Sequence, residues 1–330
     1  MQLTTASWRY IAKKTGRNFL RDDCVDLAAA LTFYAVLSLF PALLALVSLV
    51  GLLGQGQRTV DAALEFLADV APEVVVEALE GPIEQVVATP SAGLAFAAGL
   101  IGALWTASIY VNGFGQALNR IHGVEEGRPF WKLRPFMLGV TIVVLVFAAL
   151  VCAMLVVSGP ILFAVGGLVG LGDTTLQVWN FARFPLILLL VMVLVALLYY
   201  ATPNVRRHRF RWLSAGAVVA ISVWVAGSIG FGSFVTNFAT YNQTYGSLAG
   251  IVVFLLWLWI TNIALLFGAE LDSEIQRGKQ LQNGVPAEDQ VRLEPRDTQA
   301  TIKRDSQREE EERDGLRLRR GRGHPDETQP

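Results

Sequence analysis

The sequence predicts an all-α protein, a polytopic membrane bundle of six transmembrane helices with an additional amphipathic helical segment outside the cytoplasm. Hydrophobic residues make up 53% of the 330 residues and charged residues only 17%, a more apolar composition than a soluble domain of this length needs. Long uncharged stretches recur, each close to the ~20 residues that cross a bilayer. Basic residues gather in alternate connecting segments, as the positive-inside rule expects of a multi-pass protein.

A basic helix at the membrane interface is predicted for residues 1–26. Its apolar side chains share one helical face, and Lys13, Lys14 and Arg17 lie around the rest. Such a helix can rest on anionic lipid and fix the topology, or it can bind a specific partner. The apolar run begins too late for a cleaved signal peptide, so we expect the first span to remain as an anchor.

The first predicted span, residues 27–53, contains no charged residue and carries Pro41 near its middle. A proline leaves one backbone carbonyl without its helical partner, which a membrane helix tolerates when another helix or a hydroxyl is close. Tyr34, Ser38 and Pro41 follow one another at three- and four-residue steps and form a small, polar face. We therefore expect this helix at the centre of the bundle, with Pro41 against protein.

Acidic residues recur at helical spacing in the segment 55–91, between apolar ones. This pattern predicts an amphipathic helical segment outside the cytoplasm. One interpretation is a solvated face; the other is a surface that attracts cations to an extracytoplasmic mouth.

Five further spans are predicted at about 92–111, 136–163, 184–201, 213–235 and 247–271. The second span carries a polar stripe of Ser108, Asn112 and Gln116, which either joins neighbouring helices or lines a substrate path. In the last span Asn262 and Glu270 share a face. An ionised carboxylate at the cytoplasmic edge is costly unless it is paired or hydrated, so Glu270 is either an interfacial anchor or a functional residue. The fifth span carries a stripe of small residues that lets another backbone approach closely: Gly216, Ala220, Gly227 and Gly230.

The orientation follows from basic residues in two connecting segments. These are Arg128, Lys132 and Arg134 after the second span, and Arg206, Arg207, Arg209 and Arg211 after the fourth. Both segments are predicted to be cytoplasmic, which places both termini inside. Residues 272–330 are rich in charge and poor in aliphatic residues, so we expect a disordered cytoplasmic tail, apart from a transient helix around Gln307–Arg320.

Four blocks of the sequence resemble, in order, the YihY/BrkB family of bacterial inner-membrane proteins. They are ALTFYAVLSLFPALLAL (30–46), ALNRIHGVEEGRPFWKLR (117–134), LYYATPNVRRHRFRW (198–212) and YGSLAGIVVFLLWLWITNIALLFGAELDSEI (245–275). The resemblance covers roughly residues 5–275. It implies a six-helix protein of the bacterial inner (cytoplasmic) membrane whose activity is not established, and which has also carried the label ribonuclease BN.

The residues themselves argue against the ribonuclease label. A metal-dependent nuclease needs clustered His and carboxylate ligands, and the three histidines of this chain are far apart in the sequence. We therefore expect no catalytic site, metal site or cofactor, and no nucleic-acid partner.

The hypothesis that we favour is a transport-like role or a role in envelope lipid handling. Its candidate polar path consists of Tyr34, Ser38, Pro41, Ser108, Asn112, Gln116, Asn262 and Glu270. The alternative is a non-transporting membrane scaffold, and an enzyme acting on a membrane lipid ranks below both. The expected partners are anionic membrane lipids, and a homo-oligomer is left open.

Overall fold

The computed structural model describes residues 3–52, 92–156, 173–206, 214–237 and 247–320. These residues form eight helices, which are α1 (Thr5–Arg21), α2 (Cys24–Leu52), α5 (Ala92–Ile121), α6 (Phe130–Val156), α8 (Asp173–Ala201), α9 (Ala215–Asn237), α11 (Ser247–Gln282) and α12 (Gln299–Arg320). In the described part of the chain the only extended pairing is an isolated bridge between Val205 and Pro295. The predicted acidic segment 55–91 lies outside the described residues.

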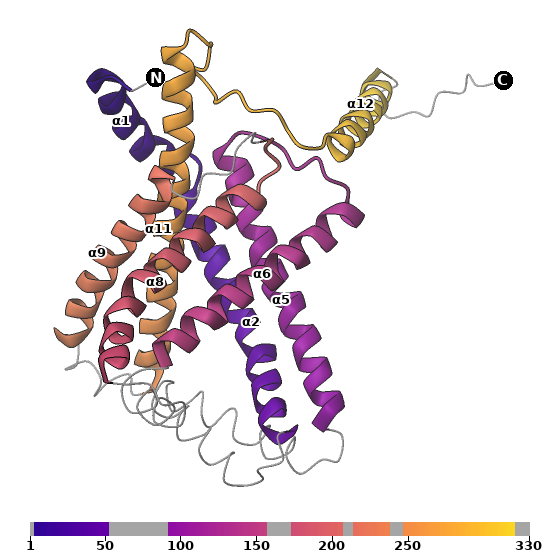
Figure 1. The fold of residues 1–330 in the computed structure, drawn as a ribbon. Coiled ribbons are helices and arrows are strands. Elements are labelled where there is room, and N and C mark those ends of the chain that lie inside the picture. Colours follow the sequence, from indigo (N-terminus) through magenta and orange to yellow (C-terminus); the bar gives the residue numbers. More distant parts are fainter. Residues whose placement is uncertain (1–2, 53–91, 157–172, 207–213, 238–246, 321–330) are drawn as a thin grey trace.

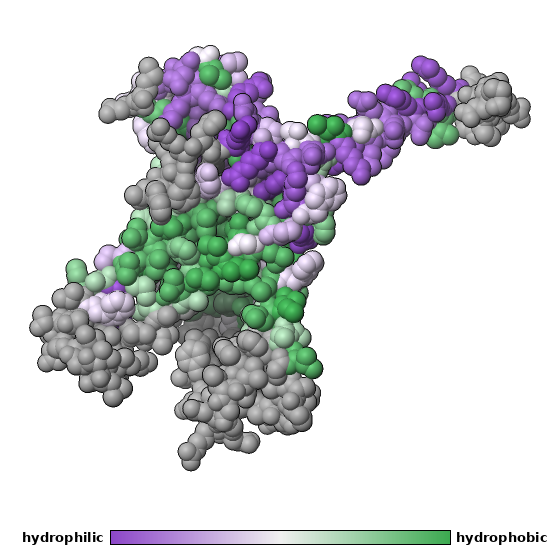
Figure 2. All heavy atoms as spheres, turned by 45° about the vertical axis from the view of Figure 1, so that its right-hand side comes forward, coloured by the Kyte–Doolittle hydropathy of each residue, from purple (hydrophilic) through white to green (hydrophobic). Residues whose placement is uncertain are grey.

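Five of the helices in the described residues are long and apolar enough to cross a membrane. Their apolar parts are Ala97–Ile121, Phe130–Val151, Phe181–Ala201, Ala215–Val235 and Gly250–Gln282, and α2 adds a shorter apolar stretch, Cys24–Leu39. Figure 2 shows apolar side chains in a band across the molecule, with hydrophilic side chains gathered at one end. We call this the hydrophilic end; α1, α12 and the last turns of α11 lie there (Figure 1). An all-helical, multi-pass membrane protein is therefore confirmed.

The core lies where α2, α5, α8 and α11 meet. It is built from buried apolar side chains such as Leu31, Phe114 and Leu266, none more than 2% exposed. A β-carbon added at Gly102 of α5 would lie 3.3 Å from Cβ of Pro41, so Pro41 lies against a neighbouring helix, as its position in the sequence predicted. The proline of α2 thus faces protein, as a proline within a membrane helix is expected to do.

Helices α9 and α11 approach each other closely at the hydrophilic end. A β-carbon at Gly216 would lie 2.1 Å from the carbonyl oxygen of Gly268, and one at Gly268 would lie 2.4 Å from that of Gly216. The Gly216 N–H donates to Oδ1 of Asp272 (2.8 Å), so a carboxylate caps the first turn of α9. The small-residue stripe predicts this contact correctly. At its other end, Gly230 has nothing within 4 Å of an added β-carbon.

The segment after residue 272 differs from the disordered tail that the sequence predicted. Helix α11 continues to Gln282, and α12 spans Gln299–Arg320. Between them, the backbone N–H of Arg296 donates to Asn204 O (3.1 Å) and that of Arg206 to Glu294 O (2.8 Å). The guanidinium of Arg296 donates to Val205 O (2.8 Å), beside the last turn of α8. The segment between α11 and α12 is ordered by polar contacts with backbone together with the burial of Ala287 and Val291.

Candidate functional site

Asn262 joins three helices in the bundle. The hydroxyl of Tyr110 in α5 donates to its Oδ1 (2.8 Å), and its Nδ2 donates to Oγ1 of Thr32 in α2 (3.1 Å). Asn262 is 2% exposed, so these bonds are shielded from water. The geometry is that of an interhelical contact.

The other predicted path residues of α2 and α5 do not meet at one place. The hydroxyl groups of Ser38 and Ser108 each donate to a carbonyl of their own helix, at 2.7 Å. The ring of Tyr34 covers Gly113, where an added β-carbon would lie 3.0 Å from two ring carbons. Asn112 is half-buried, and Gln116 is exposed. The structure therefore brings Asn262 to Thr32 and Tyr110, and does not bring the other α2 and α5 path residues to one common site.

Glu270 belongs to a buried polar cluster at the hydrophilic end. Glu270, Glu274 and Arg277 share one face of α11 at steps of four and three residues, and Asn18 of α1 packs against it. We call these four residues the α11 polar cluster; they are 1%, 0%, 4% and 5% exposed, respectively. Nδ2 of Asn18 donates to Oε1 of Glu274 (2.8 Å), which also lies 3.1 Å from Nη1 of Arg277.

Pairing within the α11 polar cluster is incomplete. Among the described residues, no hydrogen-bond partner reaches Oε2 of Glu270, Oε2 of Glu274, Oδ1 of Asn18 or Nε of Arg277. Two carboxyl groups face a single guanidinium, and buried ionisable groups are costly without full pairing. The cluster is therefore a place where water, a proton or a ligand would be stabilised.

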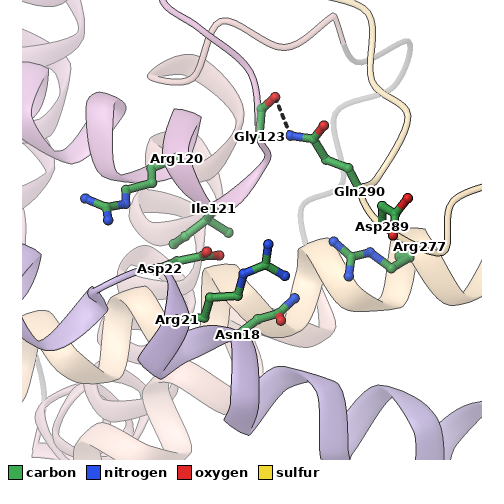
Figure 3. Close-up of a pocket in the computed structure, with 9 residues that line it drawn as sticks. All are labelled: Asn18, Arg21, Asp22, Arg120, Ile121, Gly123, Arg277, Asp289 and Gln290. Atoms are coloured by element: carbon green, nitrogen blue, oxygen red, sulfur yellow. Dashed lines mark hydrogen bonds between the residues drawn. The ribbon is translucent and has the colours of Figure 1, made fainter.

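A pocket of about 250 Å³ opens beside the cluster. Its lining comes from α1, the end of α5, α11 and the segment that follows α11, and consists of Asn18, Arg21, Asp22, Arg120, Ile121, Gly123, Arg277, Asp289 and Gln290. In Figure 3 the side chains of Arg21 and Arg277 point toward each other above Asn18, whereas Arg120 points away. Arg120 instead pairs with Asp23 at the surface. The pocket thus presents two converging guanidinium groups.

Carboxylates also line the pocket. Asp22 ends α1, and partial burial raises the pKa of its carboxyl group above the ordinary value, against the opposing effect of the nearby Arg21, Arg120 and Arg277. Asp289 approaches from the opposite side. The pocket therefore offers both hydrogen-bond donors with positive charge and acceptors with negative charge.

The basic residues predicted to set the topology have several roles. Arg128 is 9% exposed; its Nε and Nη2 donate to the two carboxylate oxygens of Glu126 (2.7 and 2.6 Å), and Nη2 also donates to Thr202 O (2.8 Å). Lys132 pairs with Asp297 at 2.8 Å. The guanidinium of Arg134 lies over the rings of Trp105 and Phe130. Of the other basic residues, Lys13, Arg17 and Arg206 are exposed and Lys14 is half-buried. The last three, Arg207, Arg209 and Arg211, lie outside the described residues. Arg128 is thus a buried structural residue as well as a basic one.

The described residues contain no group of three or more His, Cys, Asp and Glu side chains that could hold a metal ion. Sequence reasoning found Glu270 but missed Asn18, Glu274 and Arg277. The sequence contains a signal for two of these three residues: if the helix of the last span continues past residue 271, the spacing of Glu270, Glu274 and Arg277 places them on one helical face. The contribution of α1 depends on a contact between distant parts of the chain and carries no local signal.

The family model for virulence factor BrkB matches residues 15–292. This chain belongs to the BrkB family. Among its relatives, the ribonuclease-like protein YfkH of Bacillus subtilis is 31% identical over 260 residues, which cover 78% of this chain and 92% of that protein. A UPF0761 membrane protein of Alkalilimnicola ehrlichii is 29% identical over 280 residues (79% of this chain, 56% of that protein), and the UPF0761 membrane protein RC1_0578 of Rhodospirillum centenum is 28% identical over 260 residues (78% and 55%).

The match confirms the resemblance carried by the four sequence blocks. This BrkB-family chain spans about half the length of the UPF0761 relatives that it matches. No solved structure matches it. The UPF0761 name describes a membrane protein and not an enzyme, and the ribonuclease-like name belongs to YfkH alone among these three.

Proposed function

We propose that this BrkB-family protein is a transport-like protein of the bacterial inner membrane that handles anionic envelope lipids. In this proposal α2, α5, α6, α8, α9 and α11 are the six spans, and the hydrophilic end with both termini faces the cytoplasm. The excess of basic residues in the segments that meet at this end supports the orientation.

The observation that carries the proposal is the incomplete pairing of the α11 polar cluster beside an open pocket. A bundle that served only as an anchor would be more stable with apolar side chains at Glu270 and Glu274, because the Oε2 atom of each is buried without a hydrogen-bond partner among the described residues. Buried ionisable groups at the edge of a membrane span are characteristic of transport pathways and proton relays. The cluster joins the last span to the pocket, so it lies where a lipid headgroup would enter from the cytoplasmic leaflet.

The test is translocation of a labelled anionic phospholipid in liposomes that contain the purified full-length protein. Wild type should translocate the lipid faster than protein-free liposomes, and Glu270→Gln should lose most of this activity. Asp26→Asn is the matched control, because it makes the same carboxylate-to-amide change on an exposed side chain near the same end. Equal rates for folded wild-type protein and empty liposomes would refute the proposal, and equal rates for wild type and Glu270→Gln would remove Glu270 from the path.

Asn112→Ala separates the two interpretations of the α5 stripe. Asn112 is half-buried in α5, so a translocation path along this stripe predicts a lower rate in the variant. An unchanged rate would assign Asn112 to helix packing and restrict the path to the α11 side of the bundle.

A scaffold is the second candidate, and α12 favours it. None of its side chains is buried, and Figure 1 shows it projecting away from the bundle at the hydrophilic end. Its first two turns contact the α5–α6 connection and α6 through Gln299, Ala300 and Arg304, and the remaining length of this charged helix is suited to bind another protein. Deletion of residues 299–330, which leaves the packed segment 283–298 intact, should then change the proteins recovered by cross-linking in cells; an unchanged set would exclude α12 as the docking element.

A further inference from the structure

The side chain of Arg277 is held in place but incompletely paired. It is 4% exposed and lines the pocket, and its Nη1 lies 3.1 Å from Oε1 of Glu274. Its Nε has no acceptor among the described residues. A buried guanidinium whose donors point into a cavity is expected to have an acceptor in that cavity, since each unpaired donor destabilises the fold.

Arg21 brings a second guanidinium to the same cavity from the end of α1. Figure 3 shows the two groups pointing toward each other across the space above Asn18. Converging like charges repel each other; Glu274 pairs with Arg277 and the Asp22 carboxylate lies near both arginines, and an anion between the two guanidinium groups would reduce the repulsion further. The planar guanidinium fork matches two oxygens of a phosphate, and paired arginines are a common arrangement for binding this group.

The same pocket contains acceptors that a bare phosphate does not satisfy. Oδ1 of Asn18 is buried without a partner among the described residues, so it calls for a hydrogen-bond donor on the ligand. The carboxylates of Asp22 and the exposed Asp289 are also part of the lining and can accept further hydrogen bonds from it. A volume of about 250 Å³ is large enough for a phosphate together with a small polar substituent.

We propose that the pocket binds a phosphate ester whose substituent carries a hydroxyl or ammonium donor, with Arg21 and Arg277 on the phosphate and Asn18, Asp22 and Asp289 on the substituent. This is the chemistry of a phosphoglycerol or phosphoethanolamine headgroup, and equally of a soluble ester such as glycerol 3-phosphate. The assignment rests on the proposed function and names the ligand class of the same site. Glu274 acts as a positioning residue, because its Oε1 holds both Asn18 and Arg277.

Two binding experiments on the full-length protein in neutral detergent distinguish the two sources of the ester. Calorimetric titration with glycerol 3-phosphate, and with inorganic phosphate for comparison, measures binding of a soluble ester. Native mass spectrometry from micelles doped with phosphatidylglycerol or phosphatidylcholine measures lipid binding. Phosphatidylcholine is the matched lipid control, since it has the phosphate but no donor on its quaternary ammonium.

The variants are Arg21→Gln, Arg277→Lys and the control Arg17→Gln. Arg21 and Arg17 are both exposed on α1, but only Arg21 lines the pocket. The first and third variants therefore remove the same charge from exposed positions of the same helix. Arg277→Lys keeps the charge but removes the fork. We expect Arg21→Gln and Arg277→Lys each to weaken binding by about tenfold, and Arg17→Gln to bind as wild type does.

Calorimetric binding of glycerol 3-phosphate that Arg21→Gln weakens would support the site with a soluble ligand. Binding of phosphatidylglycerol over phosphatidylcholine, weakened by Arg21→Gln and without binding of the soluble ester, would support it with a headgroup. Equal binding by Arg21→Gln and Arg17→Gln in both experiments, or no binding by wild type in either, would overturn it. Binding of the ester without lipid translocation in liposomes would refute the transport role and support the phosphate-ester site. Translocation without binding of the ester would support the transport role and refute the phosphate-ester site.

Discussion

The close contact of α9 and α11 predicts that Gly268→Ala destabilises the protein. A β-carbon at Gly268 would lie 2.4 Å from the carbonyl oxygen of Gly216 and 2.6 Å from Cβ of Ala220. Neither atom can rotate away, so the two helices must separate. Separation would also stretch the 2.8 Å hydrogen bond from Gly216 N–H to Asp272, which caps the first turn of α9.

The expected loss of stability follows from three effects. Overpacking of a close contact costs about 1–3 kcal/mol, and loss of a hydrogen bond to a charged acceptor costs about 1.5–3 kcal/mol. Alanine is a better helix former than glycine by about 1 kcal/mol, which opposes both. The net prediction for Gly268→Ala is a loss of about 1.5–5 kcal/mol in the free energy of unfolding.

Thermal unfolding of the detergent-solubilised protein, followed by intrinsic fluorescence, measures the effect. The matched control is Gly230→Ala in α9, where an added β-carbon has nothing within 4 Å, so only the helix-propensity gain remains. Gly268→Ala should lower the Tm by roughly 5 °C or more, and Gly230→Ala should leave it unchanged or raise it. Equal Tm values for the two variants would refute the close contact of α9 and α11.

Three further variants test other contacts. Asn262→Ala should cost about 1–2 kcal/mol of stability, from two interhelical hydrogen bonds, while leaving lipid translocation per folded molecule unchanged; a selective loss of translocation would place Asn262 on the path. Arg128→Lys cannot serve Glu126 and Thr202 together and should lower the unfolding free energy by about 2 kcal/mol in chemical denaturation; wild-type stability would contradict the forked geometry. Asp22 has a raised pKa in the folded protein, so the stability it contributes is greatest below its unfolded pKa of about 3.9 and is lost as the pH rises through the folded pKa. Asp22→Asn should therefore be more stable than wild type at pH 7, and the difference in Tm should shrink toward pH 4; a difference that grows on acidification would show that the carboxylate is stabilised in the fold.

The sequence predicts the helical membrane bundle well because the relevant physics is local along the chain. An uncharged run of sufficient length forms a membrane span whichever helices it packs against. The position of Pro41 against another helix follows from the backbone carbonyl that a proline leaves free, and the stripe that begins at Gly216 predicts the close approach to α11. Each of these features is determined by the residues of one helix, so it can be predicted from the sequence of that helix alone.

The candidate site is less accessible to such reasoning, because it is made by contacts between distant segments. The hydrogen bond between Asn18 and Glu274 joins residues that are 256 positions apart in the sequence. The hydrogen bond from Asn204 to Asp297, which helps to fix the segment after α11, joins residues that are 93 positions apart.

The ordered segment after α11 shows the same limit from another side. Its composition indicates disorder because few apolar side chains are available for burial. In the structure the segment buries Ala287 and Val291, and polar groups add to its order: Arg296 donates to Tyr200 O and Ala201 O in the last turn of α8, and Asn204 Nδ2 donates to Asp297 O at 2.9 Å. Composition indicates only how much apolar surface a segment can bury. The bonds of Arg296 depend instead on carbonyl groups that α8 leaves unpaired at its end. Gln290 and Asp289 reach the pocket only because the segment is fixed in this way, so the same contacts that order it also complete the lining of the proposed phosphate-ester site.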